Sequence, residues 1–467
     1  MRRSLAALAL AVASGLLLFA SDTTVGAWPL LVVALLPVLA ALRWLRPGRG
    51  GAALMGLALG LGYTVPVSLA LEFPLLMAAG LAAFITAIWV LFCLGARVVS
   101  RWPAPWGGLG VGAVAVVAQY LGTTVLPAFG TAQSFARPWS AAPPAAQLAA
   151  VTGMLGLVFA LAAAPALALA LGRGPGRRAA AVALALVLAV PAAASALLWG
   201  RAPAGRVRVA AMGWVDEHLT GARNPRTQLA RVYEPLLAEA VAGGATLVVS
   251  PEVGFWLEPE AKAGVLARLQ ELARRHRVSL AAGYFDVARN DNRIAFIGPD
   301  GALAAEYQKT HLIPFLERYH PGPGALPATA LGPWRLGGMI CQDDNFTDLS
   351  RAYGRRRAQL VAVPTNDWRQ VRRFHFSNTR WRAVESRYAV VRAASNGLSA
   401  IVSPRGEVLA VKDHFVTGPA VVVADVALEA GGSAYAHTGD WVMLGLAGVL
   451  LAGGAVVNRR RRLSPAR

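Results

Sequence analysis

The sequence predicts a polytopic α-helical membrane domain of about eight transmembrane helices, with an α/β domain inserted before the last helix. Of the 467 residues, 56% are hydrophobic and only 15% are charged, whereas soluble proteins carry about 25% charged residues. Apolar stretches of membrane-spanning length recur along the chain. Between the last two of them, strand and helix patterns alternate over one long segment.

The apolar stretches define the domain organisation. They lie near residues 4–20, 27–42, 52–71, 74–96, 107–129, 146–172, 179–199 and 441–457. We therefore expect a membrane domain with seven helices over 1–200, an α/β domain over 201–438, and a C-terminal helix with a basic tail over 439–467. The first stretch also fits a secretory signal peptide, but the charge pattern favours its retention as a helix.

Arginine placement predicts the topology. Fifteen arginines fall in connecting segments on one side of the predicted spans, at Arg2, Arg3, Arg43, Arg46, Arg49, Arg97, Arg101, Arg173, Arg177, Arg178, Arg459, Arg460, Arg461, Arg462 and Arg467, and only Arg137 falls on the other side. By the positive-inside rule both termini are cytoplasmic, so the α/β domain lies outside the cytoplasm.

The net charge of +20 does not indicate a nucleic-acid-binding surface. The segment 201–438 is nearly balanced, with 29 basic and 22 acidic residues, and the remaining 16 basic and 3 acidic residues lie between and beyond the apolar stretches. The positive charge is thus a topology signal. We expect the lipid bilayer, and no nucleic acid, as a partner.

Only two cysteines occur, Cys93 and Cys341. They make neither a zinc-binding spacing nor a disulfide framework, so the sequence predicts no metal and no cofactor. Cys93 lies within an apolar stretch and is expected to be a small buried hydrophobe. Cys341 is available as a free thiol.

The inserted segment predicts a layered α/β sandwich. We expect strands over 206–212, 245–250, 278–283, 293–297, 304–307, 337–341, 360–364, 399–402 and 421–424, with helices through 233–240 and 261–275.

Three of these strands each deliver a reactive residue type at their carboxyl ends, where ligands bind in open α/β sheets. The residues are Glu252, Lys309 and Cys341. A carboxylate can take the proton of a thiol, the thiolate can attack a carbonyl carbon, and an ammonium group can stabilise the oxyanion that forms. Each residue alone is more often structural, but together they suit acyl transfer through a thioester.

The motifs around these residues resemble the nitrilase (carbon–nitrogen hydrolase) superfamily. They are Pro-Glu-x-Gly at 251–254, Tyr-x-Lys-x-His-Leu-x-Pro-Phe-x-Glu at 307–317, and Ile-Cys at 340–341. Embedding between seven leading spans and one trailing span is similar to the apolipoprotein N-acyltransferase family, as are the segments 396–406 and 435–441. The resemblance implies a nitrilase-like αββα sandwich.

The resemblance also implies roles for individual residues. Glu252 would be the general base, Lys309 the oxyanion stabiliser and Cys341 the nucleophile, with Glu317 positioning the lysine. The implied reaction moves a fatty acyl chain from a membrane phospholipid through a cysteine thioester to the N-terminal amine of diacylglyceryl-cysteine in a lipoprotein. It implies a multi-pass protein of the bacterial inner membrane with a periplasmic catalytic domain, and we expect a monomer.

Two regions around the site leave questions open. The family usually has Tyr-Glu after the nucleophile, whereas this chain has Gln342-Asp343, which puts the substrate in doubt. Four aromatic residues near the reactive positions, Phe255, Trp256, Phe315 and Trp334, are candidates for guiding acyl chains. The basic segment 369–387, with His375, Trp381 and Glu385, is expected either to contact lipid headgroups or to form a solvated helix.

A divergent acyltransferase with another acceptor is one alternative, and two alternatives of other classes remain. One is a membrane-tethered amidase whose thioester is resolved by water. The other is a transporter or scaffold that carries a relic domain, which the near absence of ionisable residues within the first seven spans disfavours.

Overall fold

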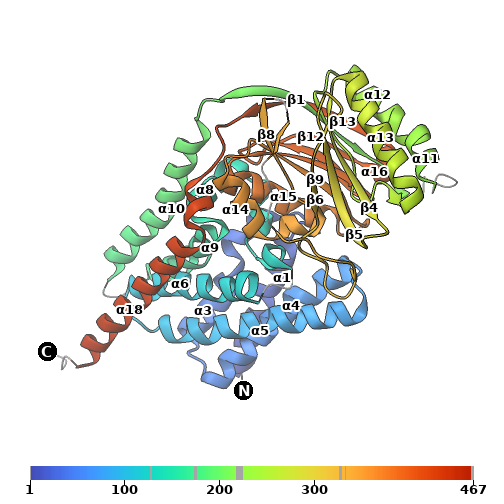
Figure 1. Cartoon of the computed structure of the whole chain (residues 1–467). Coiled ribbons are helices and arrows are strands. Elements are labelled where there is room, and N and C mark those ends of the chain that lie inside the picture. Colours follow the sequence, from blue (N-terminus) through green and yellow to red (C-terminus); the bar gives the residue numbers. More distant parts are fainter. Residues whose placement is uncertain are drawn as a thin grey trace. The chain divides into compact units, whose positions relative to one another are not determined.

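The structure is a computed structural model that describes residues 2–126, 129–172, 176–216, 224–324, 329–331 and 333–463. Arg173 and Arg467 of the predicted topology signal lie outside these residues. The chain divides into two compact units, one formed by Met1–Gly200 with Thr438–Arg467 and the other by Arg201–His437. Each unit is described by itself (Figure 1).

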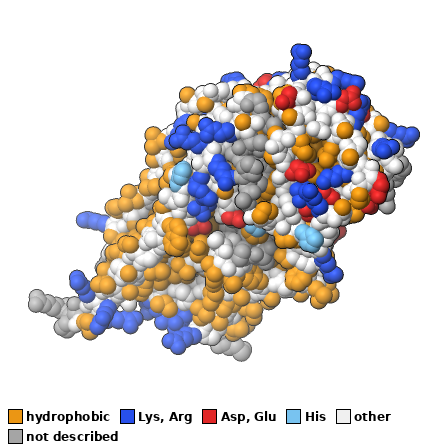
Figure 2. Space-filling view, viewed as in Figure 1, with side chains coloured by type: hydrophobic (Ala, Val, Ile, Leu, Met, Phe, Trp, Pro, Cys, Tyr) orange, Lys and Arg blue, Asp and Glu red, His pale blue; other side chains and the backbone are white. Residues whose placement is uncertain are grey.

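The first unit is helical. Its elements are α1 (Arg2–Ser21), η1 (Trp28–Leu30), α2 (Leu31–Ala34), α3 (Leu36–Trp44), α4 (Arg49–Ala70), α5 (Leu75–Val99), α6 (Trp106–Tyr120), the π-helical η2 (Leu121–Val125), η3 (Gly130–Gln133), η4 (Arg137–Ala141), α7 (Pro143–Ala146), α8 (Ala149–Thr152), α9 (Met154–Leu169), α10 (Arg177–Trp199) and α18 (Trp441–Leu463). Hydrophobic side chains cover much of the helical unit in Figure 2, with basic side chains near the end of α18.

Six of the eight predicted spans are continuous helices in the described part of the chain, each long and apolar enough to cross a membrane. The other two are interrupted. The stretch predicted at 146–172 forms a pair of helical segments bent by 113°, where Gly153 adopts a φ of +63° that favours glycine. The stretch predicted at 27–42 is divided into η1, α2 and α3, and it is shorter than the others.

Glycines let neighbouring helices of this unit approach closely. A Cβ atom on Gly15 of α1 would lie 2.4 Å from the carbonyl oxygen of Leu59 in α4, and one on Gly56 of α4 would lie 2.5 Å from the Cα of Val90 in α5. Small residues at such crossings allow backbone contact, which is how apolar helices associate in a bilayer.

Arg137, the one arginine on the far side of the predicted spans, is neutralised within the fold. Its guanidinium pairs with the carboxylate of Asp22, and both side chains are fully buried. It also donates a hydrogen bond to Oγ1 of Thr23 at 2.8 Å. A buried arginine requires such a partner, so Arg137 contributes no exposed charge at that end of the unit.

The second unit contains the strands and the remaining helices. Its elements are β1 (Gly205–Gly213), α11 (Pro225–Gln228), η6 (Leu229–Tyr233), α12 (Glu234–Ala242), β2 (Leu247–Val249), β3 (Trp256–Leu257), α13 (Pro259–His276), β4 (Ser279–Asp286), β5 (Asp291–Ile297), β6 (Leu303–Gln308), β7 (Thr329–Leu331), β8 (Trp334–Gly338), η7 (Cys341–Asn345), α14 (Thr347–Arg355), β9 (Leu360–Asn366), α15 (Arg372–Ser386), β10 (Ala389–Ser395), β11 (Leu398–Val402), β12 (Val408–Asp413), α16 (His414–Thr417), β13 (Ala420–Leu428) and α17 (Ala434–Thr438).

Two sheets form the centre of this unit. Within the described residues, the first has the order β13-β1-β2-β4-β5-β6, with β3 added beside β4, and the second has the order β12-β11-β10-β9-β8-β7. Each contains three adjacent parallel strands, β1-β2-β4 and β8-β9-β10, flanked by antiparallel ones. The sequence patterns did not predict β3, β7, β10 or β12.

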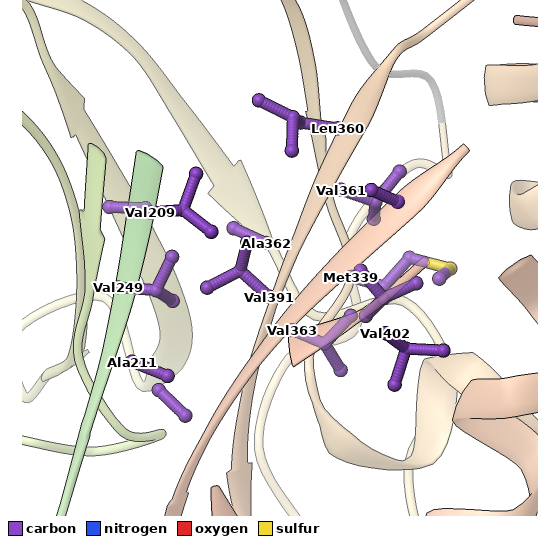
Figure 3. Packing of buried hydrophobic residues seen from close by; sticks show 14 of the residues in the cluster. Val209, Ala211, Val249, Met339, Leu360, Val361, Ala362, Val363, Val391 and Val402 are labelled. Carbon is purple, nitrogen blue, oxygen red and sulfur yellow. The ribbon is translucent and has the colours of Figure 1, made fainter. Parts of the chain in front are cut away.

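The apolar core lies between the two sheets. Figure 3 shows side chains of the first sheet, Val209, Ala211 and Val249, on one side of the interface, and those of the second sheet, Ala362 and Val391, on the other. Helices α12 and α13 cover the outer face of the first sheet through a second apolar cluster, and α14 and α15 contact the second sheet and η7. The predicted αββα sandwich is confirmed.

Helix α13 illustrates how the local sequence sets the element boundaries. Glu258 precedes the helix in an extended conformation, and Pro259 occupies the first turn, where its missing N–H costs no hydrogen bond. Three basic residues fill the last turn, where they favour the negative end of the helix dipole. The helix ends when Arg277 turns left-handed at a φ of +52°.

Candidate active site

Glu252 lies just beyond the carboxyl end of β2, and its carboxylate is buried at 4% exposure. Its Oε1 accepts hydrogen bonds from Nζ of Lys309 and from Nδ2 of Asn292, both at 2.8 Å. Its Oε2 accepts one from the backbone N–H of Asn366 at 2.7 Å. Three donors from three strands or strand ends therefore fix both oxygens of this carboxylate.

Lys309 follows β6 directly and is fully buried. Besides its bond to Glu252, its Nζ donates to Oε1 of Glu317 at 2.6 Å. The other oxygen of Glu317 accepts from the backbone N–H of Ile313 at 2.7 Å. Burial alone would lower the pKa of Lys309, but the charges of Glu252, Cys341 and Glu317 raise it well above its ordinary value, so the lysine is held as an ammonium group.

Cys341 begins η7, three residues after β8 ends at Gly338, so the predicted strand was too long at this end. The thiol is 3% exposed, and its Sγ lies 3.7 Å from the carbonyl oxygen of Asn366. Burial and the charge of Glu252 raise the pKa of Cys341 well above its ordinary value, although Lys309 opposes the shift. The resting group is therefore a protonated thiol.

The protonation of Glu252 complements that of the thiol. Burial raises the pKa of Glu252, and the charge of Glu317 adds to the increase, while Lys309 opposes it. A carboxylate with a raised pKa is a stronger base than an ordinary glutamate. The structure thus brings together a base, an ammonium group and a thiol, all from residues that the sequence placed at strand ends.

Three residues in or beside the reactive segments have a left-handed backbone. Cys341 has a φ of +47°, Val253, next to Glu252, has +48°, and Phe315, in the segment between Lys309 and Glu317, has +69°. A left-handed valine is a clear outlier because its branched Cβ crowds the backbone. Such conformations cost about 1–3 kcal/mol each and cluster where function requires a fixed geometry.

Asp343 ties the lysine segment to the nucleophile segment. One oxygen of its fully buried carboxylate accepts hydrogen bonds from the backbone N–H groups of Thr310 and His311, at 3.2 and 2.7 Å. The other accepts from the hydroxyl of Tyr307 at 2.5 Å and the N–H of Ile340 at 2.9 Å. Asp343, the acid that follows Gln342, therefore has a defined positioning role. It binds the backbone just after Lys309 and just before Cys341.

We expect Asp343→Asn to lower the free energy of unfolding by about 2–3 kcal/mol, because an amide N–H₂ in place of either oxygen faces donors and leaves them unpaired. Burial lowers the pKa of His311, but bonds to Asp343 and Asp348 outweigh it and raise that pKa to about 9. The stability from the contact between His311 and Asp343 is fully present below pH 6.5 and is lost as the pH rises through about 9, where His311 loses its proton. Chemical denaturation at several pH values tests this.

Asp300→Asn is the matched control for that experiment. Asp300 is an exposed turn residue whose Oδ1 accepts one bond from the N–H of Ala302. It should change stability by less than about 0.5 kcal/mol. Equal effects of the two substitutions would contradict the role given to Asp343.

A cavity of about 370 Å³ opens beside the buried cluster. Its walls include both glutamates, the amide of Asn292, three aromatic rings and the residue whose carbonyl contacts the thiol: Glu252, Glu317, Asn292, Trp256, Phe285, Tyr319 and Asn366. A lining that combines aromatic rings with carboxylates suits a substrate that joins a hydrocarbon portion to a polar reacting group.

The four predicted aromatic contacts separate into two groups. Trp256 is 52% exposed, stacks on Phe285 with ring centroids 4.4 Å apart, and lines the cavity. Phe315 is 83% exposed. In contrast, Phe255 is buried against Tyr233 in the core cluster under α12 and α13, and Trp334 packs against the core between the sheets. Phe255 and Trp334 therefore contribute to packing and are not among the residues that line this cavity, so their position does not support the prediction.

Helix α15 also differs from its prediction. His375, Trp381 and Glu385 are at most 6% exposed, so these three residues face the interior and α15 is not a solvated helix. Arg369 and Arg373 are exposed, and contact of this segment with lipid headgroups stays a prediction. Gln342 is buried as well, and its Oε1 accepts a hydrogen bond from Asn345 at 2.6 Å.

The sequence patterns missed two residues of the site, Asn292 and Asn366. Asn366 lies at the carboxyl end of β9, a position comparable to those of the three reactive residues. The expectation that site residues lie at the carboxyl ends of strands would have found it if it had been applied to β9. Asn292 lies near the beginning of β5 and had no such signal.

Comparisons with known proteins show the family of the α/β unit. The family model for carbon–nitrogen hydrolases matches residues 211–436. A human omega-amidase is 30% identical over 225 residues, which cover 41% of this chain and 80% of the amidase. The chain belongs to the carbon–nitrogen hydrolase superfamily. The superfamily predicted from the sequence motifs is thus confirmed, and the chain is an enzyme of this superfamily.

Within the superfamily, the relatives include membrane acyltransferases. The apolipoprotein N-acyltransferase of Geobacter metallireducens is 30% identical, with 52% of this chain and 51% of the relative covered. That of Gloeobacter violaceus is also 30% identical, with 54% of each covered. The match therefore spans about half the length of these relatives. Together with the apolar helices, they identify a membrane-bound carbon–nitrogen hydrolase that is similar to this acyltransferase family.

Among solved structures, the amidase from Nesterenkonia sp. AN1 is similar at 24% identity and a TM-score of 0.39, covering 49% of this chain and 93% of that chain.

Proposed function

We propose that this carbon–nitrogen hydrolase transfers a fatty acyl chain from a membrane phospholipid to the N-terminal amine of diacylglyceryl-cysteine in lipoproteins. The observation that carries the proposal is the buried contact of Glu252 with Lys309, beside the thiol of Cys341, in a membrane-bound chain. The acyltransferase relatives supply the substrate class.

In the first half-reaction, Glu252 takes the proton of the Cys341 thiol and the thiolate attacks the ester carbonyl of the phospholipid. The ammonium group of Lys309 stabilises the oxyanion. Collapse of the tetrahedral intermediate breaks the ester C–O bond, and Glu252 returns the proton to the departing lysophospholipid oxygen. The products are a thioester on Cys341 and a lysophospholipid.

In the second half-reaction, the lipoprotein amine attacks the thioester carbonyl. Glu252 takes a proton from the amine, the C–S bond breaks, and the proton passes to the departing sulfur of Cys341. An amide forms and the thiol is restored. Glu317 holds the lysine in place during both halves, because its carboxylate lies 2.6 Å from Nζ.

The proposal includes the partners and the location of the protein. Trp256, which lines the cavity, and the exposed Phe315 would contact acyl chains. The arginine distribution supports cytoplasmic termini and a catalytic domain outside the cytoplasm. The proposal places this domain in the periplasm, on a monomeric protein of the bacterial inner membrane.

The test is to incubate the purified full-length protein with phospholipid vesicles and a synthetic diacylated lipopeptide, and to analyse the peptide by mass spectrometry. We expect a mass increase of one fatty acyl chain at the peptide amine, together with lysophospholipid. Spheroplasts given the lipopeptide from outside should form the same product if the catalytic domain is periplasmic. An amidase would instead release free fatty acid or ammonia and leave the peptide unmodified, which would overturn the proposal.

A further inference from the structure

The end of strand β9 holds the proposed base and the proposed nucleophile at once. The backbone N–H of Asn366 donates to Oε2 of Glu252 at 2.7 Å, while the carbonyl oxygen of the same residue lies 3.7 Å from Sγ of Cys341. This one residue therefore contacts both groups, and its position affects the separation between the carboxylate and the thiol. Contacts that hold the chain at 366–367 bear on that separation.

The next residue, Asp367, is held by two cations. Its Oδ1 lies 2.7 Å from Nδ1 of His375 on α15, and its Oδ2 accepts a hydrogen bond from the guanidinium of Arg392 on β10 at 2.8 Å. All three side chains are at least nine-tenths buried. Asp367 thus cannot move without breaking two charged contacts in a region without bulk water.

Asp344 of η7 closes this arrangement from the other side. Its Oδ1 lies 3.1 Å from Nε2 of His375, and its Oδ2 lies 3.2 Å from the guanidinium of Arg392 and accepts a hydrogen bond from the hydroxyl of Thr379 at 2.6 Å. Two carboxylates and two cationic side chains therefore alternate around a closed, buried network. We call Asp344, Asp367, His375 and Arg392 the Asp–His network.

The charges of the network balance only when His375 is protonated. Burial lowers the pKa of His375, but the charges of Asp344 and Asp367 outweigh burial and the opposing charge of Arg392, and raise that pKa to about 9. Burial raises the pKa values of both aspartates, yet His375 and Arg392 hold them below their ordinary values. At neutral pH the network is a neutral set of two positive and two negative groups.

Cys341, Asp367 and His375 also offer ligand atoms within 4.8 Å of one another, a spacing that a metal ion could use. However, each ring nitrogen of His375 faces a carboxylate oxygen, and the guanidinium of Arg392 lies 3.1 Å from Nδ1. A protonated ring beside a guanidinium disfavours a second cation, so the geometry favours a proton over a metal.

We propose that His375 is a positioning residue of the catalytic centre, whose positive charge neutralises Asp367 and fixes the 366–367 segment so that Glu252 can take the proton of Cys341. The inference rests on the proposed role of Cys341 as the nucleophile. Asp367 adds to the groups that raise the pKa of the thiol. Loss of the positive charge would leave that carboxylate uncompensated, and the thiolate would form less readily.

The test is the rate at which iodoacetamide alkylates Cys341 between about pH 6 and 10, measured in the full-length protein in a Cys93→Ala background. We expect His375→Gln to move the alkylation profile to higher pH by about one unit, which lowers the rate at pH 8 about tenfold. The Asp344→Asn variant keeps the His375 ring, but without the Asp344 carboxylate the ring binds its proton less tightly. This variant should match the parent at low pH and fall behind as the pH rises, because the ring loses its charge earlier.

His414→Gln is the matched control, since His414 is a buried histidine whose ring contacts Ser399 Oγ and Gly418 O at 2.8 and 2.9 Å. We expect it to keep the parent profile even if its thermal stability falls. If His375→Gln does not fold, Asp344→Asn decides the question. If both network variants show the same pH profile of Cys341 alkylation as the parent, the inference is overturned. If the parent forms no acyl adduct on Cys341, the proposed function is overturned instead.

Discussion

Replacement of Lys309 with methionine is expected to lower acyl transfer by roughly 10²–10³-fold and the free energy of unfolding by roughly 3–5 kcal/mol. Methionine keeps much of the side-chain volume but removes the charge. Glu252 and Glu317, which lie 2.8 and 2.6 Å from Nζ, would then face each other without a cation between them. Activity falls because the oxyanion loses its stabilising charge. Stability falls because two carboxylates are left uncompensated.

The pH dependence separates this variant from a simple packing defect. Burial and the charge of Glu317 raise the pKa of Glu252, and Lys309 opposes this shift, so removal of the lysine raises that pKa further above its value in the unfolded state. The variant should therefore recover stability as the pH falls and Glu252 is protonated, and lose it as the pH rises. Thermal unfolding of both proteins between about pH 5 and 8 measures the difference.

A double variant tests the two effects independently. Lys309→Met with Glu317→Gln removes one of the opposed charges, so we expect it to regain part of the stability. It should regain no activity, because the ammonium group is still missing. Recovery of activity in the double variant would show that Lys309 acts only as a structural counterion.

Replacement of Cys341 with alanine is expected to abolish the acyl-enzyme and to lower turnover by roughly 10³-fold or more, since no other group can carry the thioester. Intact-mass analysis after exposure to phospholipid vesicles should show an adduct of fatty-acyl size on the unmodified protein and none on Cys341→Ala. The thermal midpoint should change little, because the contact of the thiol with the carbonyl oxygen of Asn366 is long, at 3.7 Å.

Cys93→Ala is the control for this experiment. Cys93 is the second free cysteine and is fully buried in α5. It should form the adduct as the parent does. An adduct that persists in Cys341→Ala, or that vanishes in Cys93→Ala, would contradict the assignment of the nucleophile.

The reactive residues could be predicted because each follows a strand within a recognisable motif. Their partners were harder to predict because they depend on which strands become neighbours. Asp367 follows β9 and reaches α15 and β10 through contacts that have no fixed sequence spacing. Likewise, the charges of α15 suggested a solvated helix, whereas buried counterions from other elements surround His375.

The predictions for the aromatic residues and for two of the membrane spans were incomplete for related reasons. Phe255 and Trp256 are adjacent, and only their directions distinguish a core residue from one that lines the cavity. In the helical unit, apolar composition located all eight stretches. It could not show that Gly153 breaks one of them or that another is divided after Leu35, because hydropathy contains no information on backbone hydrogen bonds.

The carboxylate of Asp343 has a consequence for the entry of lipid substrates. Tyr307 belongs to the first sheet, whereas Ile340 follows the last residues of a strand in the second. One side chain receives hydrogen bonds from both, so the two layers of the sandwich are locked together immediately beside the thiol. We expect an acyl chain to gain access by rearrangement of the segment 312–319 and of Trp256 at the rim, while the layers themselves remain closed.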